Sequence, residues 1–101
     1  MQLMTAHYRD AKQRGAAWLL DQLHPDGSIG DPAEGFRFYR VPWTFMVAGH
    51  TEAAARVCGW IRANMLTAEG DFDNGLRVLR DAYAYRNATL IYGAHMARQY
   101  A

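Results

Sequence analysis

The sequence predicts an all-α fold of stacked antiparallel helical hairpins. Three observations lead to this prediction: apolar residues recur every three or four positions, no segment alternates apolar and polar residues as a strand would, and part of the first half of the chain recurs in the second half. The chain has 101 residues, and half of them are apolar. This length allows one domain with a modest core, so we expect a single helical domain over residues 1–101.

The first predicted helix covers about residues 4–23. Positions that step by three or four residues place one set of side chains on a single face: Met4, Tyr8, Ala11, Gly15, Trp18, Leu19 and Gln22. We expect the helix to end before Pro25, which cannot continue the hydrogen-bond ladder, at a turn formed by Asp26 and Gly27. Residues 30–38 then predict a surface loop that leads to the next helix.

A short second helix is predicted over about residues 41–48. Val41, Phe45 and Ala48 resume helical spacing. Pro42 suits the first turn of a helix, where its missing N–H costs nothing, and Gly49 suits the C-terminal end.

Two further helices follow in the second half. The third begins at Thr51, which we expect to be its N-cap, and ends near residues 64–67. Its predicted buried stripe consists of Ala54, Val57, Cys58, Ile61 and Met65. After an irregular stretch, a fourth helix is expected over about residues 85–99.

The two halves of the chain are similar in sequence. Trp18 aligns with Trp60, 42 residues later, whereas the Gly27-Ser28 turn aligns with Gly70-Asp71 at a separation of 43. Tyr39-Arg40 and the helix after it correspond to Tyr85-Arg86 at a separation of 46. A period of this length with the order helix, glycine turn, loop, helix is typical of stacked hairpins. We therefore expect one repeat over about residues 4–48 and another over about 51–99.

One string within the first repeat carries a family resemblance. Arg14-Gly15-x-x-Trp18-Leu19-x-x-Gln22-x-x-Pro25-Asp26-Gly27-Ser28 resembles the QW-type repeat of squalene and hopene cyclases and the related repeat of protein prenyltransferases. The resemblance implies a partial α/α toroid of the terpenoid-cyclase and prenyltransferase type, with about two hairpins. It also implies acid-initiated cyclisation or isomerisation of an apolar, isoprenoid-like substrate. The sequence departs from the family pattern at Gln22, which lies one place early, and at Ile29, where the family has tryptophan.

The candidate acids are Asp71 and Asp73. The segment Asp71-Phe72-Asp73-Asn74 resembles the acidic motif with which class II terpenoid cyclases protonate an alkene or epoxide. A carboxyl group can act in this way when burial or a second carboxylate keeps it protonated. Asn74 replaces the third acidic residue of that motif. Asp71 also aligns with Ser28 in the turn of the first repeat, so a purely structural role in a turn is the alternative.

A set of aromatic residues provides candidates for substrate binding. Aromatic rings that face a cavity stabilise cations and line pockets for apolar ligands, although aromatic residues at helical spacing also form ordinary cores. The candidate substrate-binding residues are Tyr39, Trp43, Phe45, Tyr85 and Tyr92.

Charge and composition narrow the classes of partner. The 11 basic and 10 acidic residues give a formal charge of +1, which predicts no attraction to nucleic acid. No apolar run is long enough to cross a bilayer, so we expect no membrane span and a cytoplasmic location. Cys58 is the only cysteine, and the four histidines are dispersed. We therefore expect no metal site and no cofactor.

Two classes of function remain open from the sequence. One is a cyclase-type or isomerase-type enzyme, and the other is a non-catalytic helical-repeat module for assembly or for binding a hydrophobic ligand. Two hairpins alone leave apolar faces uncovered. The partners we expect are therefore other copies of the chain in a homo-oligomer, or the remainder of a larger toroid, with an apolar small molecule as a possible ligand.

Overall fold

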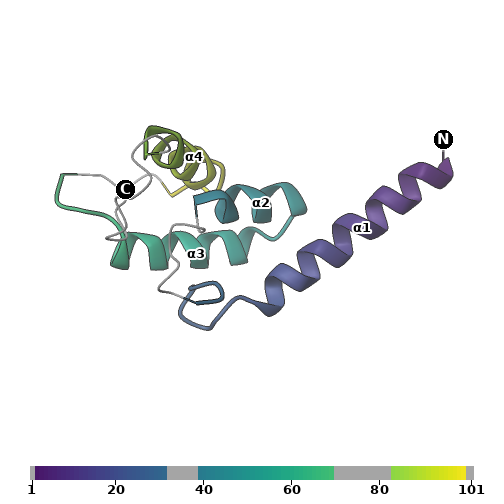
Figure 1. Cartoon of the computed structure of the whole chain (residues 1–101), viewed down its shortest axis with the longest axis horizontal. Helices are drawn as coiled ribbons and strands as arrows, with labels where there is room; N and C mark the ends of the chain where they lie inside the picture. Colours follow the sequence, from purple (N-terminus) through teal and green to yellow (C-terminus); the bar gives the residue numbers. More distant parts are fainter. Residues whose placement is uncertain (1, 32–38, 70–82, 100–101) are drawn as a thin grey trace.

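The computed structural model of the chain describes residues 2–31, 39–69 and 83–99 (Figure 1). These residues contain four α-helices and no β-strand: α1 (Gln2–Asp21), α2 (Val41–Ala48), α3 (Thr51–Asn64) and α4 (Tyr83–Met96). The prediction of an all-α fold is confirmed. The expected bounds of α2 and α3 agree with the structure, whereas α1 and α4 each begin and end slightly earlier than predicted.

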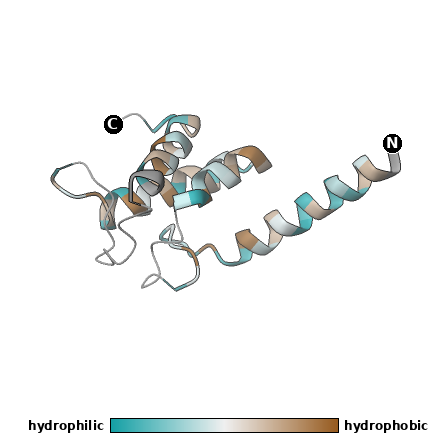
Figure 2. Cartoon of the chain, turned by 45° about the horizontal axis from the view of Figure 1, so that its top comes forward, coloured by the Kyte–Doolittle hydropathy of each residue, from teal (hydrophilic) through white to brown (hydrophobic). Residues whose placement is uncertain are grey.

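The core lies where α2, α3 and α4 meet. α2 contacts both α3 and α4, and these two helices also contact each other. The predicted stripe of α3 is buried, as the 3.6-residue period requires for a helix with one covered face. The cluster consists of Val41, Phe45, Ala53, Ala54, Val57, Cys58, Ile61, Met65, Leu90 and Ala97. Figure 2 shows apolar residues concentrated on these helices.

Two helices end in the same way but with different residues. Gly49 follows α2 with a φ of 88°, and the N–H of His50 donates to the carbonyl of Phe45 at 2.8 Å. Arg98 follows α4 with a φ of 60°, and the N–H of Gln99 donates to the carbonyl of Ala94 at 2.8 Å. At both ends a residue in the left-handed conformation allows the last helix carbonyls to be hydrogen-bonded. Only Gly49 predicts this conformation from the sequence, because Arg98 has a Cβ atom.

The expectation that Thr51 caps α3 is wrong. The first hydrogen bond of this helix runs from the N–H of Ala54 to the carbonyl of His50 at 3.0 Å. His50 is therefore the N-cap, and its side chain makes no capping hydrogen bond. Thr51 is already the first helical residue, because the chain turns directly out of the Gly49 end of α2.

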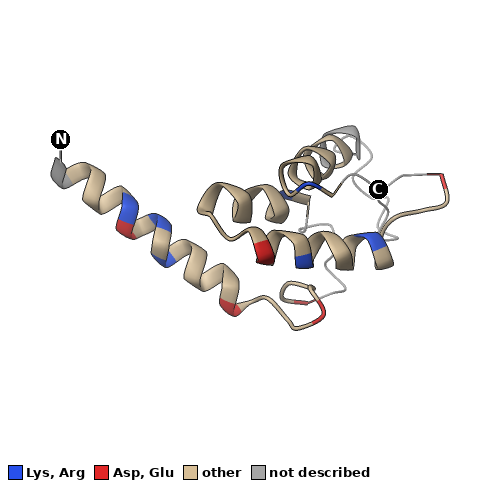
Figure 3. Ribbon diagram, turned by 180° about the vertical axis from the view of Figure 1, so that it is seen from behind, with Lys and Arg blue, Asp and Glu red and all other residues tan. Residues whose placement is uncertain are grey.

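α1 projects from the rest of the molecule, as Figure 1 shows. Its C-terminal end packs on the core through Leu19 and Leu20, and it has a further contact with α2. Trp18, which shares the predicted face, is 64% exposed, and Met4 and Tyr8 are exposed as well. Figure 3 shows positively and negatively charged residues interspersed along α1, so no patch of a single sign forms there.

Candidate functional site

A tight turn joins α1 to the loop that follows it. The N–H of His24 donates to the carbonyl of Ser28 at 2.8 Å, and the N–H of Gly30 donates to the carbonyl of Gln22 at 3.0 Å. Leu23 and Ile29 form an isolated antiparallel bridge. These bonds close residues 22–30 into a compact unit, which we call the first turn.

The first turn is seated on α3. Gly27 has a φ of 98°, and a Cβ atom placed on it would lie 2.2 Å from the carbonyl oxygen of Arg56 and 3.1 Å from Cβ of Trp60. Only glycine combines this backbone conformation with so close an approach. The contact joins the turn of the first predicted repeat to the first helix of the second.

Asp26 and Ser28 organise the inside of this turn. Oδ1 of Asp26 accepts hydrogen bonds from the backbone N–H of Ser28 at 2.9 Å and from its hydroxyl at 2.7 Å. These two bonds favour the ionised carboxylate and lower the pKa of Asp26 below its usual 3.8. Ser28 is buried, and the bond to Asp26 satisfies its hydroxyl, so both residues have a structural role in the turn.

Replacing Ser28 with alanine is expected to raise the pKa of Asp26 towards its usual value, because the hydroxyl bond is the largest cause of the shift. The lowered folded-state pKa stabilises the native state above the unfolded value, and this contribution is lost as the pH falls through the folded value. NMR titration of the Asp26 carboxyl carbon measures the change. An Asp26 pKa that is the same in both proteins would contradict the assignment.

A mainly apolar groove lies between α1 and α2. Its volume is about 460 Å³. α1 forms one wall and α2 the other, and no carboxylate lies among the lining residues. These are Lys12, Gly15, Ala16, Trp43, Thr44, Val47 and Ala48. We call this feature the α1–α2 groove. Its apolar lining suits a hydrophobic ligand or a helix.

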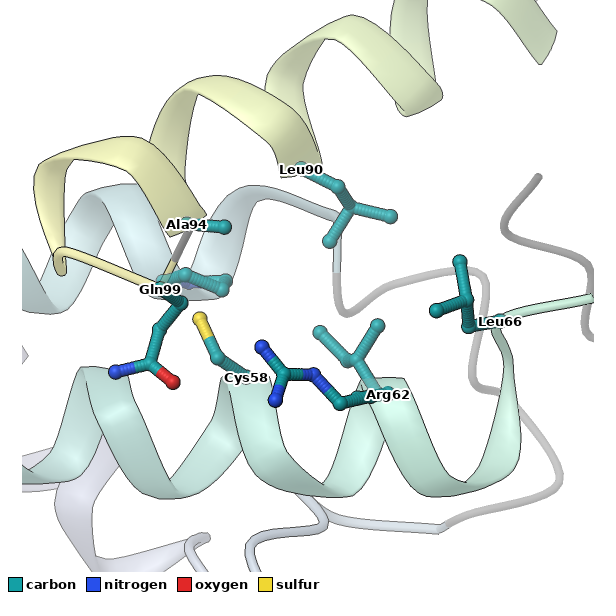
Figure 4. Close-up of a pocket in the computed structure, with 8 residues that line it drawn as sticks. Cys58, Arg62, Leu66, Leu90, Ala94 and Gln99 are labelled. Atoms are coloured by element: carbon teal, nitrogen blue, oxygen red, sulfur yellow. The ribbon is translucent and has the colours of Figure 1, made fainter. Parts of the chain in front are cut away.

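A smaller pocket of about 80 Å³ lies between α3 and the end of α4. Cys58 and Arg62 of α3 line it together with Ala94 and Gln99 (Figure 4). Burial raises the pKa of the Cys58 thiol, and the nearby Arg62 opposes this shift only in part. A thiol that stays protonated is a poor nucleophile, so Cys58 acts here as a small apolar core residue.

The predicted aromatic residues whose side chains are described divide between the neighbourhood of the α1–α2 groove and the core. Trp43 lines the α1–α2 groove, and its ring meets that of Tyr92 edge to face, with 6.0 Å between the centroids. Phe45 is 0% exposed and belongs to the core. Tyr39 packs against the same core, with the guanidinium of Arg40 over its ring. Tyr85 lies in α4, but its side chain is outside the described part of the chain.

Of the predicted residues, Trp43 and Tyr92 meet in a ring contact beside the groove. The candidate acids Asp71 and Asp73 lie outside the described residues. Sequence reasoning missed the other groove residues, among them Lys12, Ala16 and Val47. The internal alignment contains a signal for them, because it pairs groove positions of the first repeat with core positions of the second.

Two further kinds of site are absent from the described ranges. Residues 2–31, 39–69 and 83–99 contain no group of three or more His, Cys, Asp or Glu side chains placed to hold a metal ion. None of the helices in these ranges has the length and apolar character needed to cross a bilayer.

Comparison with known proteins returns no relative. No protein-family model, no curated protein and no solved structure matches the chain.

Proposed function

We propose that the chain is a helical-repeat module whose hairpins assemble with other hairpins of the same kind, as part of a larger or oligomeric α/α toroid. The main support for this proposal is the close contact of Gly27 with α3, where the turn of one hairpin packs against the first helix of the next. A residue with a Cβ atom could not make this contact, so the contact is specific to this arrangement of turn and helix. It supports a mode of stacking that repeats along the series of hairpins.

Exposed apolar side chains at both ends of the hairpin pair support the same proposal. Met4, Tyr8 and Trp18 are exposed on α1, and Ile91 and Tyr92 are exposed on α4. In the stacked arrangement each hairpin covers a face of its neighbour, so the outer helices are the ones that keep such residues uncovered. Covering these ends with further hairpins would remove apolar surface from water.

The test is the mass of the purified chain in solution, measured by light scattering over a concentration series. We expect a mass that rises above the 11.4 kDa of a single chain and reaches a defined multiple of it. A constant monomer mass up to high concentration would contradict assembly through copies of the chain.

Acid-initiated cyclisation of an isoprenoid-like substrate remains the second candidate function. The contact between the exposed rings of Trp43 and Tyr92 favours it, since exposed aromatic faces attract cations and apolar ligands. The α1–α2 groove has no carboxylate in its described lining, so the acid would have to come from elsewhere. Asp71 and Asp73 stay predictions for that role, and an assembled toroid would supply the enclosure that such chemistry requires.

A further inference from the structure

We propose that the α1–α2 groove binds α4 of a second copy of this chain, which continues the hairpin stack head to tail. This inference rests on the proposed assembly function and identifies the two surfaces that meet. The second repeat is covered at the positions where the first repeat is left open.

α2 contacts both α3 and α4, and its Phe45 is 0% exposed. The approach to α4 is close, because a Cβ atom on Gly93 would lie 2.8 Å from the backbone nitrogen of Trp43 and 3.0 Å from Cβ of Pro42. α2 is therefore seated between the two helices of the second repeat.

α1 contributes one wall of the α1–α2 groove. Lys12, Gly15 and Ala16 form this wall. At the separation of 42 residues that pairs Trp18 with Trp60, they align with three buried core residues of α3: Ala54, Val57 and Cys58. The positions that are covered in α3 are thus the ones that form an open wall in α1.

The wall that α2 contributes obeys the same rule. At the separation of 46 residues that pairs Tyr39 with Tyr85, its four groove residues align with four residues of α4: Thr89, Leu90, Gly93 and Ala94. Leu90 and Gly93 are buried, and Ala94 packs against the core. The α1–α2 groove of the first repeat therefore corresponds to the surface of α3 and α4 on which α2 packs in the second repeat.

One helix of the chain is left with a matching uncovered face. The helix that corresponds to α2 is α4, and Ile91 of α4 aligns with Phe45 of α2. Phe45 is 0% exposed whereas Ile91 is 59% exposed. Likewise, Ala88 is exposed where its counterpart Pro42 is buried. α4 thus presents to solvent the face that α2 uses for docking.

The chemistry of the two surfaces agrees with this pairing. Gly15 and Ala16 allow a helix backbone to approach closely, and space around Gly15 is open. Lys12 replaces a buried alanine of α3, but its aliphatic stem can lie along an apolar partner while the ammonium group stays in water. Because the groove and α4 are different surfaces, the contact is heterologous, and copies join head to tail.

The decisive experiment uses one charged substitution on each surface. Val47→Arg alters the groove and Ile91→Arg alters the docking helix, and both side chains are 59% exposed, so each variant should fold as the wild type does by circular dichroism. An arginine forced into an apolar contact loses hydration. We expect each variant alone to associate at least about tenfold more weakly than the wild type.

Mixing the two variants supplies the sharpest result. One intact groove and one intact α4 then remain, on different chains, so we expect a heterodimer of twice the 11.4 kDa chain mass. Leu66→Arg is the control, since Leu66 is also an exposed apolar residue but follows α3, outside both surfaces. This control should associate as the wild type does.

The outcomes separate this inference from the proposed function. If the wild type associates and both arginine variants associate equally well, the head-to-tail contact is wrong while assembly stands. The contact is also wrong if the mixture stays monomeric, or if only Val47→Arg weakens association. A wild type that stays monomeric at every concentration overturns both proposals.

Discussion

Replacing Gly27 with alanine is expected to lower the free energy of unfolding by about 3 kcal/mol. The new methyl group would lie 2.2 Å from the carbonyl oxygen of Arg56, and the φ of 98° is itself strained for any residue with a Cβ atom. The neighbour is helix backbone, so it cannot swing away as a flexible side chain would. The first turn must therefore lift off α3 or shift it. Urea unfolding followed by circular dichroism, at a concentration where the chain is monomeric, measures the loss.

Gly30→Ala is the matched control for this substitution. Gly30 also has a positive φ, of 58°, but no atom lies within 4 Å of the added Cβ. Its cost is then limited to the backbone strain, about 1 kcal/mol. Equal losses in the two variants would mean that the contact between the first turn and α3 contributes nothing to stability.

Truncating Phe45 to alanine is expected to destabilise the fold by about 3–5 kcal/mol. Phe45 is 0% exposed and packs where α2, α3 and α4 meet, so its removal leaves a cavity that no neighbouring helix can fill without moving. A chain of this size has a total stability of about 5–15 kcal/mol, so the variant would lose much of it. Chemical denaturation, with the midpoint and slope compared, measures the effect.

Val47→Ala serves as the control in the same helix. Val47 is 59% exposed, so its truncation should change the free energy of unfolding of the monomer by less than about 0.5 kcal/mol. If Phe45→Ala costs as little as Val47→Ala, then Phe45 does not hold the three helices together.

The sequence predicts the positions of the helices better than it predicts which residues pack against each helix. Hydrophobic spacing identifies α3 and its buried stripe, and Pro42 with Gly49 places both ends of α2 correctly, because these signals act within one or two turns of the residues themselves. Periodicity also places Tyr8 and Trp18 on one face of α1. It cannot say what covers that face, because burial depends on a partner distant in sequence or on another chain.

The candidate site was harder to predict for the same reason. Phe45 and Trp43 are both aromatic and lie two residues apart, yet one is in the core and the other lines the α1–α2 groove. Which side of α2 meets α3 decides between these roles, and that is a property of the packed helices. The end of α4 shows a similar limit, since Arg98 adopts the left-handed conformation without the glycine that would predict it.

The projecting part of α1 has a thermodynamic consequence. Asp10 and Arg14 form an exposed ion pair at 3.0 Å, and such a pair adds only about 0.3–0.5 kcal/mol to an isolated helix. Short helices without packing are marginal in water, since forming the first turn is costly. The helix–coil equilibrium of this segment is therefore finely balanced. A partner that covers α1 also stabilises its helical conformation. Formation of the helix and binding of the partner are therefore thermodynamically coupled.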